Sequence, residues 1–208
     1  MLEEKYCNTC EEIARLDESG YCLNCGKHSD NMTKKTLLEN AKEYAIRCHA
    51  DTNHKYDYHP YSKHLEMVLD VAYQFIDLIP EEDRELVLSA CWCHDTIEDT
   101  RQTPNDVTKA TNLGVAKIVY AVTNEKGWAR IDRANDVYYY GIKDQPYATF
   151  VKLCDRIANI EYSKSTGSSM FTKYKKENVH FLNKLWTSEL QPMWDYIDQL
   201  FTTEKIIT

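Results

Sequence analysis

Residues 80–95 read PEEDRELVLSACWCHD and decide the fold class of the chain. Pro80 suits the first turn of a helix, and the three acids after it favour the positive end of a helix dipole. The apolar residues that follow recur at the spacing of one buried helical face. We therefore predict a helix whose C-terminal end delivers His94 and Asp95. Its buried face consists of Leu86, Val87, Ala90 and Cys91.

The same helical period continues on both sides of this stretch. Upstream, one apolar stripe runs from Thr33 to about His49, and a second follows Pro60. Six glycines and five prolines in 208 residues disfavour a turn-rich β-sandwich or barrel. We expect an all-α bundle of about eight to ten helices. Further helices are predicted from Pro104, over 114–122, over 129–141 and over 146–163, and two amphipathic helices complete the chain.

Charge and hydropathy exclude several classes of protein. The chain has 25 lysines and arginines against 33 aspartates and glutamates, and this net charge of −8 argues against broad nucleic-acid binding. No uncharged run approaches the roughly 20 apolar residues that a membrane span needs. The first residues, MLEEKYCNTC, lack the apolar segment of a signal peptide. We expect a cytoplasmic protein that does not associate with membranes.

Four of the eight cysteines form two CxxC pairs near the N-terminus. Each pair can direct two thiolates toward one ion, and four thiolates complete a closed tetrahedral site of the kind that holds structural zinc. A segment of about 25 residues has too small a core to fold without such a staple. We predict a Zn²⁺ ribbon over residues 1–31 and a main domain over 32–208, with free or redox-active thiols as the alternative. The cysteines are Cys7, Cys10, Cys22 and Cys25.

Ionisable side chains interrupt the apolar faces of three predicted helices. His64 lies on the buried face of one helix, and Asp155 lies in the inward stripe of another. Together with His94 and Asp95 they supply two imidazoles and two carboxylates. That donor set suits Mn, Fe, Mg or Zn and leaves positions open for water and substrate. The alternative is structural, in which each histidine makes one hydrogen bond in the core and each aspartate caps a helix.

Three motifs carry a resemblance to a known family. They are the segment HADTNHKYDYHPYSKH at 49–64, which ends in PYSKH, CWCHDTIEDT at 91–100 and FVKLCDRIANI at 150–160. Over about residues 38–185 the chain resembles the HD superfamily, and within it the hydrolase domain of RelA/SpoT alarmone enzymes and their small, metazoan SpoT-like homologues. The resemblance implies an all-helical HD-domain fold. It also implies removal of the 3′-pyrophosphate of guanosine tetra- and pentaphosphate, the nucleotides of the stringent response, typically with Mn²⁺.

The resemblance implies roles for individual residues as well. The four ionisable residues of the buried faces would bind Mn²⁺ or another divalent metal. Glu98 and Asp99 match the acidic pair that handles the attacking water, and either could act as the general base. The alternative is that these two acids cap the helix that begins near Pro104. The implied metal ligands are His64, His94, Asp95 and Asp155.

Substrate contacts are implied at five further positions. Asn159, one helical turn after Asp155, matches the family's asparagine that faces the nucleotide sugar. Lys55 stands where the family has a basic pair near the base and phosphates, but this loop is shorter and has His54 in place of an arginine. For the cationic candidates, a solvated basic face is the alternative. The remaining candidates, for phosphate contacts, are Lys126, Arg130 and Tyr174.

Two other functions are compatible with the same residues. The first keeps the metal site and changes the substrate to NADPH, with loss of its 2′-phosphate, or to another nucleotide, because the loop at Lys55 departs from the family pattern. The second is a nucleotide-sensing module without catalysis. The expected partners are a small nucleotide and, through the ribbon, a second copy of the chain or another protein. The ribbon would then be a docking surface, an oligomerisation element or a cap.

Overall fold

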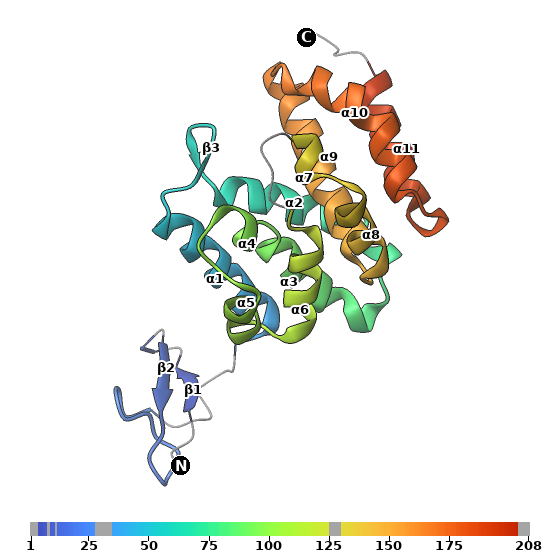
Figure 1. Cartoon of the computed structure of the whole chain (residues 1–208). Coiled ribbons are helices and arrows are strands. Elements are labelled where there is room, and N and C mark those ends of the chain that lie inside the picture. The colour runs from blue at the N-terminus through green and yellow to red at the C-terminus, as the bar shows by residue number, and fades with distance from the viewer. Residues whose placement is uncertain (1–3, 8, 11, 28–34, 125–129, 204–208) are drawn as a thin grey trace.

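Helices dominate the computed structural model, which describes residues 4–7, 9–10, 12–27, 35–124 and 130–203 (Figure 1). The predicted all-α class is confirmed. Eleven α-helical segments occur within these ranges, and α4 and α7 are single turns of four residues, so that nine longer helices remain. No described helix combines the length and the hydropathy that a bilayer crossing requires. The helices are α1 (Leu37–Asp51), α2 (Ser62–Gln74), α3 (Arg84–Cys93), α4 (Thr96–Asp99), α5 (Pro104–Ala110), α6 (Leu113–Val122), α7 (Arg130–Arg133), α8 (Asp136–Asp144), α9 (Ala148–Thr166), α10 (Met170–Leu185) and α11 (Gln191–Thr202).

Helix α5 begins at Pro104 as predicted, and Thr103 is its cap. The Thr103 side chain accepts a hydrogen bond from the N–H of Asp106, and the Asp106 carboxylate accepts one from the N–H of Thr103 at 3.0 Å. This reciprocal capping box satisfies N–H groups that the first turn leaves without helical partners. The cap is therefore neither Glu98 nor Asp99, and the structural alternative for these two acids is wrong.

The single helix predicted over 129–141 is divided into α7 and α8. The Asn135 side chain accepts a hydrogen bond from the N–H of Tyr138 at 3.0 Å, so that Asn135 caps a new helix beginning at Asp136. An apolar period averages over such a break, because one polar residue between two helical stretches changes the pattern very little.

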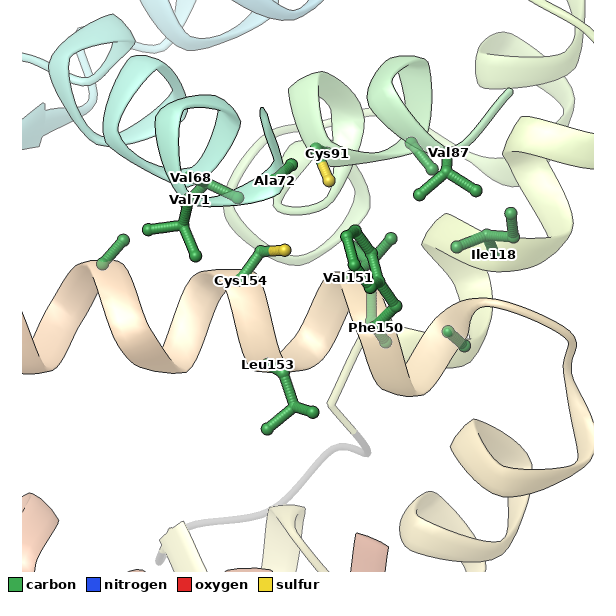
Figure 2. Close-up of a cluster of buried hydrophobic side chains, with 14 of the residues drawn as sticks. Val68, Val71, Ala72, Val87, Cys91, Ile118, Phe150, Val151, Leu153 and Cys154 are labelled. Atoms are coloured by element: carbon green, nitrogen blue, oxygen red, sulfur yellow. The ribbon is translucent and has the colours of Figure 1, made fainter. Parts of the chain in front are cut away.

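Helix α9 is the centre of the bundle. It packs against α2, α3, α6, α8, α10 and α11, and Figure 2 shows its apolar side chains lying among those of its neighbours. Burial of each large apolar side chain contributes about 1.5–3 kcal/mol, so this core holds α9, and with it Asp155, in place. The labelled side chains are Val68, Val71 and Ala72 from α2, Val87 and Cys91 from α3, Ile118 from α6, and Phe150, Val151, Leu153 and Cys154 from α9.

A short β-hairpin lies between α1 and α2, where the sequence indicates only a polar loop. Strand β3 (Lys55–Tyr56) pairs antiparallel with β4 (His59–Pro60), which places Tyr56 opposite His59. Asp57 in the turn has a φ of +51°, in the left-handed region that aspartate tolerates better than most residues. Strands of two residues are too short for the alternating pattern that would reveal them in a sequence.

A second hairpin, near the N-terminus, has a small core of its own. Strand β1 (Glu4–Cys7) pairs antiparallel with β2 (Glu12–Arg15). The apolar cluster beneath this hairpin is separate from the core of the helices. The predicted boundary between residues 31 and 32 lies outside the described residues, so the division into two domains stays a prediction. The buried residues of the small cluster are Cys7, Ala14, Leu16 and Cys22.

Candidate active site

Two histidines and an aspartate from three parts of the bundle meet in its interior. His64 lies in the first turn of α2, His94 directly follows α3, and Asp155 lies in the middle of α9. The Nε2 atom of His64 is 3.3 Å from Oδ1 of Asp155, and the Nε2 atom of His94 is 3.9 Å from the same oxygen. One ligand atom from each residue lies within 4.8 Å of the others, so the three side chains can reach one ion.

Asp95, the fourth predicted ligand, lies against both histidines. Its Oδ2 atom is 2.8 Å from Nε2 of His94 and 3.5 Å from Nε2 of His64. The Tyr61 hydroxyl donates a hydrogen bond to the same oxygen at 2.5 Å. The structure therefore brings together all four residues that the sequence singled out as ligands. It adds Tyr61, which the sequence reasoning missed although it lies three residues before His64.

A backbone carbonyl orients His94. The Nδ1 atom of His94 is 2.8 Å from the carbonyl oxygen of Cys91, and because a carbonyl can only accept, Nδ1 must carry the proton. The other nitrogen, Nε2, then faces Asp95 and Asp155. Nε2 is buried and has no hydrogen-bond partner among the described residues. Histidines that bind metals are oriented in this way by a group on the opposite ring nitrogen.

The buried charges in the cluster shift the pKa values of its members strongly. Burial lowers the pKa of His64, but the hydrogen bonds and charges of Asp155 and Asp95 outweigh it and raise the value to about 9. The charge of Asp95 likewise outweighs burial at His94 and raises its pKa. Burial raises the pKa of Asp95, whereas His94 and His64 hold it well below its usual value. Two buried carboxylates thus draw protons onto the imidazoles, and a divalent cation would replace those protons.

This donor set fits a divalent cation. Imidazole nitrogens and carboxylate oxygens suit Mn²⁺, Mg²⁺, Fe²⁺ or Zn²⁺. The imidazole nitrogens lie 2.8 to 3.9 Å from the carboxylate oxygens. Such separations are those of neighbouring ligands that each lie about 2.1 Å from one ion. The unpartnered Nε2 atom of His94 is the kind of atom that such an ion would satisfy.

The acidic pair Glu98 and Asp99 lies in α4, beside the cluster. The Glu98 carboxylate accepts hydrogen bonds from the side chain of Asn124 at 2.6 Å and from its backbone N–H at 3.3 Å. Asp99 accepts a hydrogen bond from the Tyr61 hydroxyl at 3.3 Å, so Tyr61 touches both Asp99 and Asp95. Burial, followed by the charges of Asp95 and Glu98, raises the pKa of Asp99 to about 7.

A cavity of about 720 Å³ joins these groups. His64, Asp95 and Asp155 line it, as do both acids of α4. Its volume lies in the range of pockets that hold small ligands such as nucleotides. Cationic side chains from α7, α9 and α10 line the same cavity, which therefore combines a candidate metal site with groups that bind anions. These cationic residues are Arg133, Lys152, Arg156, Lys173 and Lys176.

The predicted substrate contacts have different outcomes in the structure. Asn159 and Tyr174 line the cavity. Lys55 is exposed on β3 and is not among the residues that line the cavity. Lys126 lies outside the described residues, and so does the side chain of Arg130. Contact between substrate and any of these five residues stays a prediction.

Lys152 is a further residue that the sequence reasoning missed. Its Nζ atom is 3.0 Å from Oδ2 of Asp155, and its side chain is only 16% exposed. Burial lowers the pKa of Lys152, but the charge of Asp155 outweighs it and holds the value well above that of an ordinary lysine. The i,i+3 spacing within KLCD was the available signal, because it places both residues on one helix face.

Arg156, the neighbour of Asp155, has a different environment. Its guanidinium lies over the rings of Tyr174 and Phe181, at 4.5 and 4.9 Å from their centres. It also donates hydrogen bonds to Glu177 at 3.2 Å and to the backbone carbonyl of Tyr174 at 3.0 Å. These contacts join α9 to α10, so Arg156 stabilises the wall of the cavity.

The four N-terminal cysteines converge as the two CxxC pairs predict. The sulfur atoms of Cys7 and Cys25 are 3.4 Å apart, those of Cys10 and Cys22 are 3.8 Å apart, and all four lie within 4.8 Å of one another. These separations exclude disulfides, and all four cysteines are free. Burial raises the pKa of Cys7, but hydrogen bonds from the Cys10 backbone and the Cys25 thiol lower it to about 6. The cluster therefore fits an ion that prefers thiolates.

Comparison with known proteins supports the resemblance. No protein-family model matches the chain. The guanosine-3′,5′-bis(diphosphate) 3′-pyrophosphohydrolase of Mus musculus is 32% identical over 75 residues, which are 36% of this chain and 42% of the mouse enzyme. The chain is therefore matched to less than half of that relative. Among solved structures, one described as a metazoan ortholog of SpoT that hydrolyses ppGpp has a TM-score of 0.59 at 22% identity, and covers 80% of this chain and 96% of that chain. The resemblance stated from the motifs is confirmed, and the fold is shared.

Proposed function

We propose that this chain is a divalent-metal-dependent hydrolase that removes the 3′-pyrophosphate of guanosine tetra- and pentaphosphate. One observation carries the proposal: His64, Asp95 and Asp155 line a cavity that lysines and arginines also line, and His94 lies directly behind them against Asp95. A metal beside several cations suits a substrate whose reactive part is a pyrophosphate group, here joined to the ribose by the O3′–phosphorus ester bond that water would cleave. The similarity to the mouse enzyme and to the SpoT ortholog supports this choice of substrate.

His64, His94, Asp95 and Asp155 would hold Mn²⁺ or another divalent ion. The ion would polarise the scissile phosphoryl group and lower the pKa of a coordinated water. The chain's contribution is to present the donors in one arrangement, with the Cys91 carbonyl orienting His94. Burial of the two histidines excludes bulk water from one side of the site.

We assign Asp99 as the general base that takes a proton from the attacking water. Tyr61 donates to both Asp99 and Asp95, so this carboxylate lies next to a proposed metal ligand. The two oxygens of Glu98 accept hydrogen bonds from Asn124, which suits a role in orienting the water.

The cations of the cavity would bind the phosphates of the substrate. Lys152 lies beside Asp155 and would contact the pyrophosphate group that is transferred to water, with GDP as the leaving group, whereas Lys173 and Lys176 are exposed on α10. Asn159 would face the nucleotide sugar. Tyr174, Lys55, Lys126 and Arg130 are kept as candidates for further contacts with phosphates or base.

The proposal includes Zn²⁺ at the four N-terminal cysteines. Four thiolates leave no position for substrate, so this ion would have a structural role. Thiols of this kind persist in a reducing compartment, and the proposal therefore places the protein in the cytoplasm.

Product analysis tests the proposed function directly. Purified protein with Mn²⁺ is incubated with ppGpp, and GDP and pyrophosphate are the expected products. The Asp95→Asn variant should lose this activity, whereas Asp70→Asn, which changes an exposed aspartate of α2, should retain it. No turnover of ppGpp with Mn²⁺, Mg²⁺ or Zn²⁺ by the intact protein would overturn the proposal.

Hydrolysis of a different nucleotide is the second candidate. The observation that favours it is the position of His54, whose ring stacks on Tyr61 at 4.0 Å and on His49 at 5.2 Å and does not line the cavity. Lys55 is also absent from the lining residues, so the family's contacts to the base are not reproduced by these two. Incubation with NADPH and with simple nucleotides under the same conditions distinguishes the two candidates.

A further inference from the structure

We infer that Tyr56 is a positioning residue of the candidate metal site, which orients His64 with its ring and Asn159 with its hydroxyl. The binding of a metal at this site and the role of Asn159 both rest on the proposed function. Tyr56 lies on β3. The inference depends on how the two histidines of the cluster are held.

The two histidines are held in different ways. His94 is oriented by the hydrogen bond between its Nδ1 atom and the Cys91 carbonyl at 2.8 Å. The Nδ1 atom of His64 is buried and has no hydrogen-bond partner within the described part of the chain. The polar contacts of His64 are therefore confined to Nε2, and on the Nδ1 side the orientation of the ring must come from packing.

Tyr56 supplies that packing. Its ring lies parallel to the imidazole of His64, with 4.8 Å between ring centres and 14° between ring planes. Tyr61 contacts His64 edge-on, at 5.3 Å and 63°. A stacked ring on one side and a ring edge on another hold the plane of the imidazole, and in that plane Nε2 faces Asp95 and Asp155.

The hydroxyl of Tyr56 has a second partner on α9. It donates a hydrogen bond to Oδ1 of Asn159 at 2.8 Å. With Oδ1 engaged, the Nδ2 group of Asn159 points the other way and donates to Oδ1 of Asp155 at 2.5 Å and to its backbone carbonyl at 3.0 Å. That carboxylate oxygen is the one nearest His64. Tyr56 therefore contacts one proposed metal ligand, His64, with its ring, and it is linked to a second, Asp155, through Asn159.

The hairpin that carries Tyr56 is anchored to α9 by a further contact. Tyr162 meets the Tyr56 ring edge-on at 4.8 Å and 65°, and a hydrogen bond with Asp57 raises the pKa of Tyr162. Asp155, Asn159 and Tyr162 share one face of α9 because they are four and then three residues apart. The β3–β4 turn thus lies along the face that carries the proposed metal ligand, and it links α9 to the start of α2.

Binding of Mn²⁺ alone tests this inference without any substrate. The free ion is titrated into the full chain and followed by its electron paramagnetic resonance signal, and the melting temperature is recorded in EDTA. The thiolate cluster is common to all variants and prefers softer ions than Mn²⁺. The variants are Tyr56→Leu, which removes ring and hydroxyl, and Tyr56→Phe, which removes only the hydroxyl. Tyr58→Leu is the matched control, because Tyr58 lies in the same hairpin and is 96% exposed.

We expect Tyr56→Leu to weaken Mn²⁺ binding about tenfold or more, as loss of an orienting neighbour does at other metal sites. Tyr56→Phe should keep Mn²⁺ affinity within about threefold and lower kcat/KM for ppGpp about three- to tenfold through the released Asn159 amide. Tyr58→Leu should match the unmodified chain in Mn²⁺ affinity and in kcat/KM for ppGpp. A purely structural role would lower the melting temperature in EDTA without changing the affinity of the folded protein for Mn²⁺.

Two results would overturn the inference. One is Mn²⁺ affinity in Tyr56→Leu equal to that of Tyr58→Leu, and the other is Tyr56→Phe with unchanged kcat and KM. If Tyr56→Leu does not fold, Tyr56→His keeps a flat ring over His64, and its Mn²⁺ affinity should then equal that of Tyr56→Phe. A chain that binds Mn²⁺ in this Tyr56-dependent way but does not hydrolyse ppGpp would refute the proposed function and leave the inference about His64 intact.

Discussion

The two candidate metal sites of this chain are built in opposite ways. The four cysteines lie on a short hairpin and its turns, and among the described residues Cys7 and Cys22 are buried there with Ala14 and Leu16. The histidines and aspartates lie on helices of the bundle, and the packing of α9 against its neighbours brings them together. In the first region the proposed ion would hold the fold. In the second region the fold holds the ligands.

This contrast follows from the size of the two cores. A segment as short as residues 4–27 buries too little apolar surface to offset its loss of conformational entropy, so a metal must supply the difference. The bundle buries enough apolar surface to be stable by itself. It can therefore accommodate two carboxylates in its interior, which are costly in any fold that lacks a counter-charge for them.

The largest effect is expected from Cys22→Ser. Structural zinc contributes about 10–16 kcal/mol to metal-coupled folding, so loss of one buried thiolate should unfold the hairpin of residues 4–27. The melting temperature of the bundle should not change. Zinc content by mass spectrometry and dispersed amide signals in NMR spectra measure the two regions separately. Cys48→Ser is the matched control, since it changes a buried cysteine of the bundle. It should leave the zinc content unchanged and lower the melting temperature of the bundle. Retention of zinc by Cys22→Ser would contradict the proposal that the hairpin depends on its ion whereas the bundle does not.

The next largest effect is expected from Asp155→Asn. An amide has no charge to hold a cation, so ppGpp hydrolysis should fall at least about a thousandfold, or roughly 4 kcal/mol of transition-state stabilisation. The variant should keep its helical circular dichroism and its zinc content, because the bundle does not depend on the ion. Asp144→Asn, an exposed change near the end of α8, should leave kcat/KM unaltered. Loss of helical structure in Asp155→Asn would mean that the bundle also needs its metal ligands to fold.

The sequence predicts the cysteine site more completely than it predicts the site of histidines and aspartates. The two CxxC pairs specify all four sulfur ligands because each pair is local, and only one turn must bring the pairs together. The helical period places His64, His94, Asp95 and Asp155 on buried faces, and their motifs support a common site. What the period does not specify is how distant segments meet, and Tyr56 shows this most clearly. It lies 103 residues before its hydrogen-bond partner Asn159, on a strand too short to leave a pattern.

The remaining differences have similar physical causes. The division between α7 and α8 depends on one side-chain cap, that of Asn135, which a periodic pattern averages over. The ion pair of Lys152 with Asp155 depends on rotamers within a packed wall, and spacing alone permits several. Sequence patterns therefore predict which residues are buried better than they predict which polar groups contact each other there.

A smaller and more specific effect is expected from Lys152→Met. The ammonium group is 3.0 Å from the Asp155 carboxylate, and removal of one partner from a buried pair costs about 3 kcal/mol. A divalent cation at the site would supply part of the missing positive charge. Urea unfolding should therefore show a larger loss of stability in EDTA than in Mn²⁺. Lys143→Met, an exposed change on α8, should show no such dependence on the ion. Equal losses in the two conditions would mean that Mn²⁺ does not bind beside Asp155.

The smallest effect, and the most direct test of whether the fold holds the ligands, is expected from Thr103→Ala. Loss of the side-chain cap of α5 should lower the stability of the bundle by about 1 kcal/mol, whereas Thr103→Ser should keep it. Neither change touches the cavity, so the folded Thr103→Ala protein should bind Mn²⁺ and zinc as tightly as the unmodified chain. Equilibrium unfolding and Mn²⁺ titration measure the two quantities independently. A tenfold weaker Mn²⁺ affinity in Thr103→Ala would show that the ligand geometry follows the overall stability of the bundle, and the distinction between the two sites would then be one of degree.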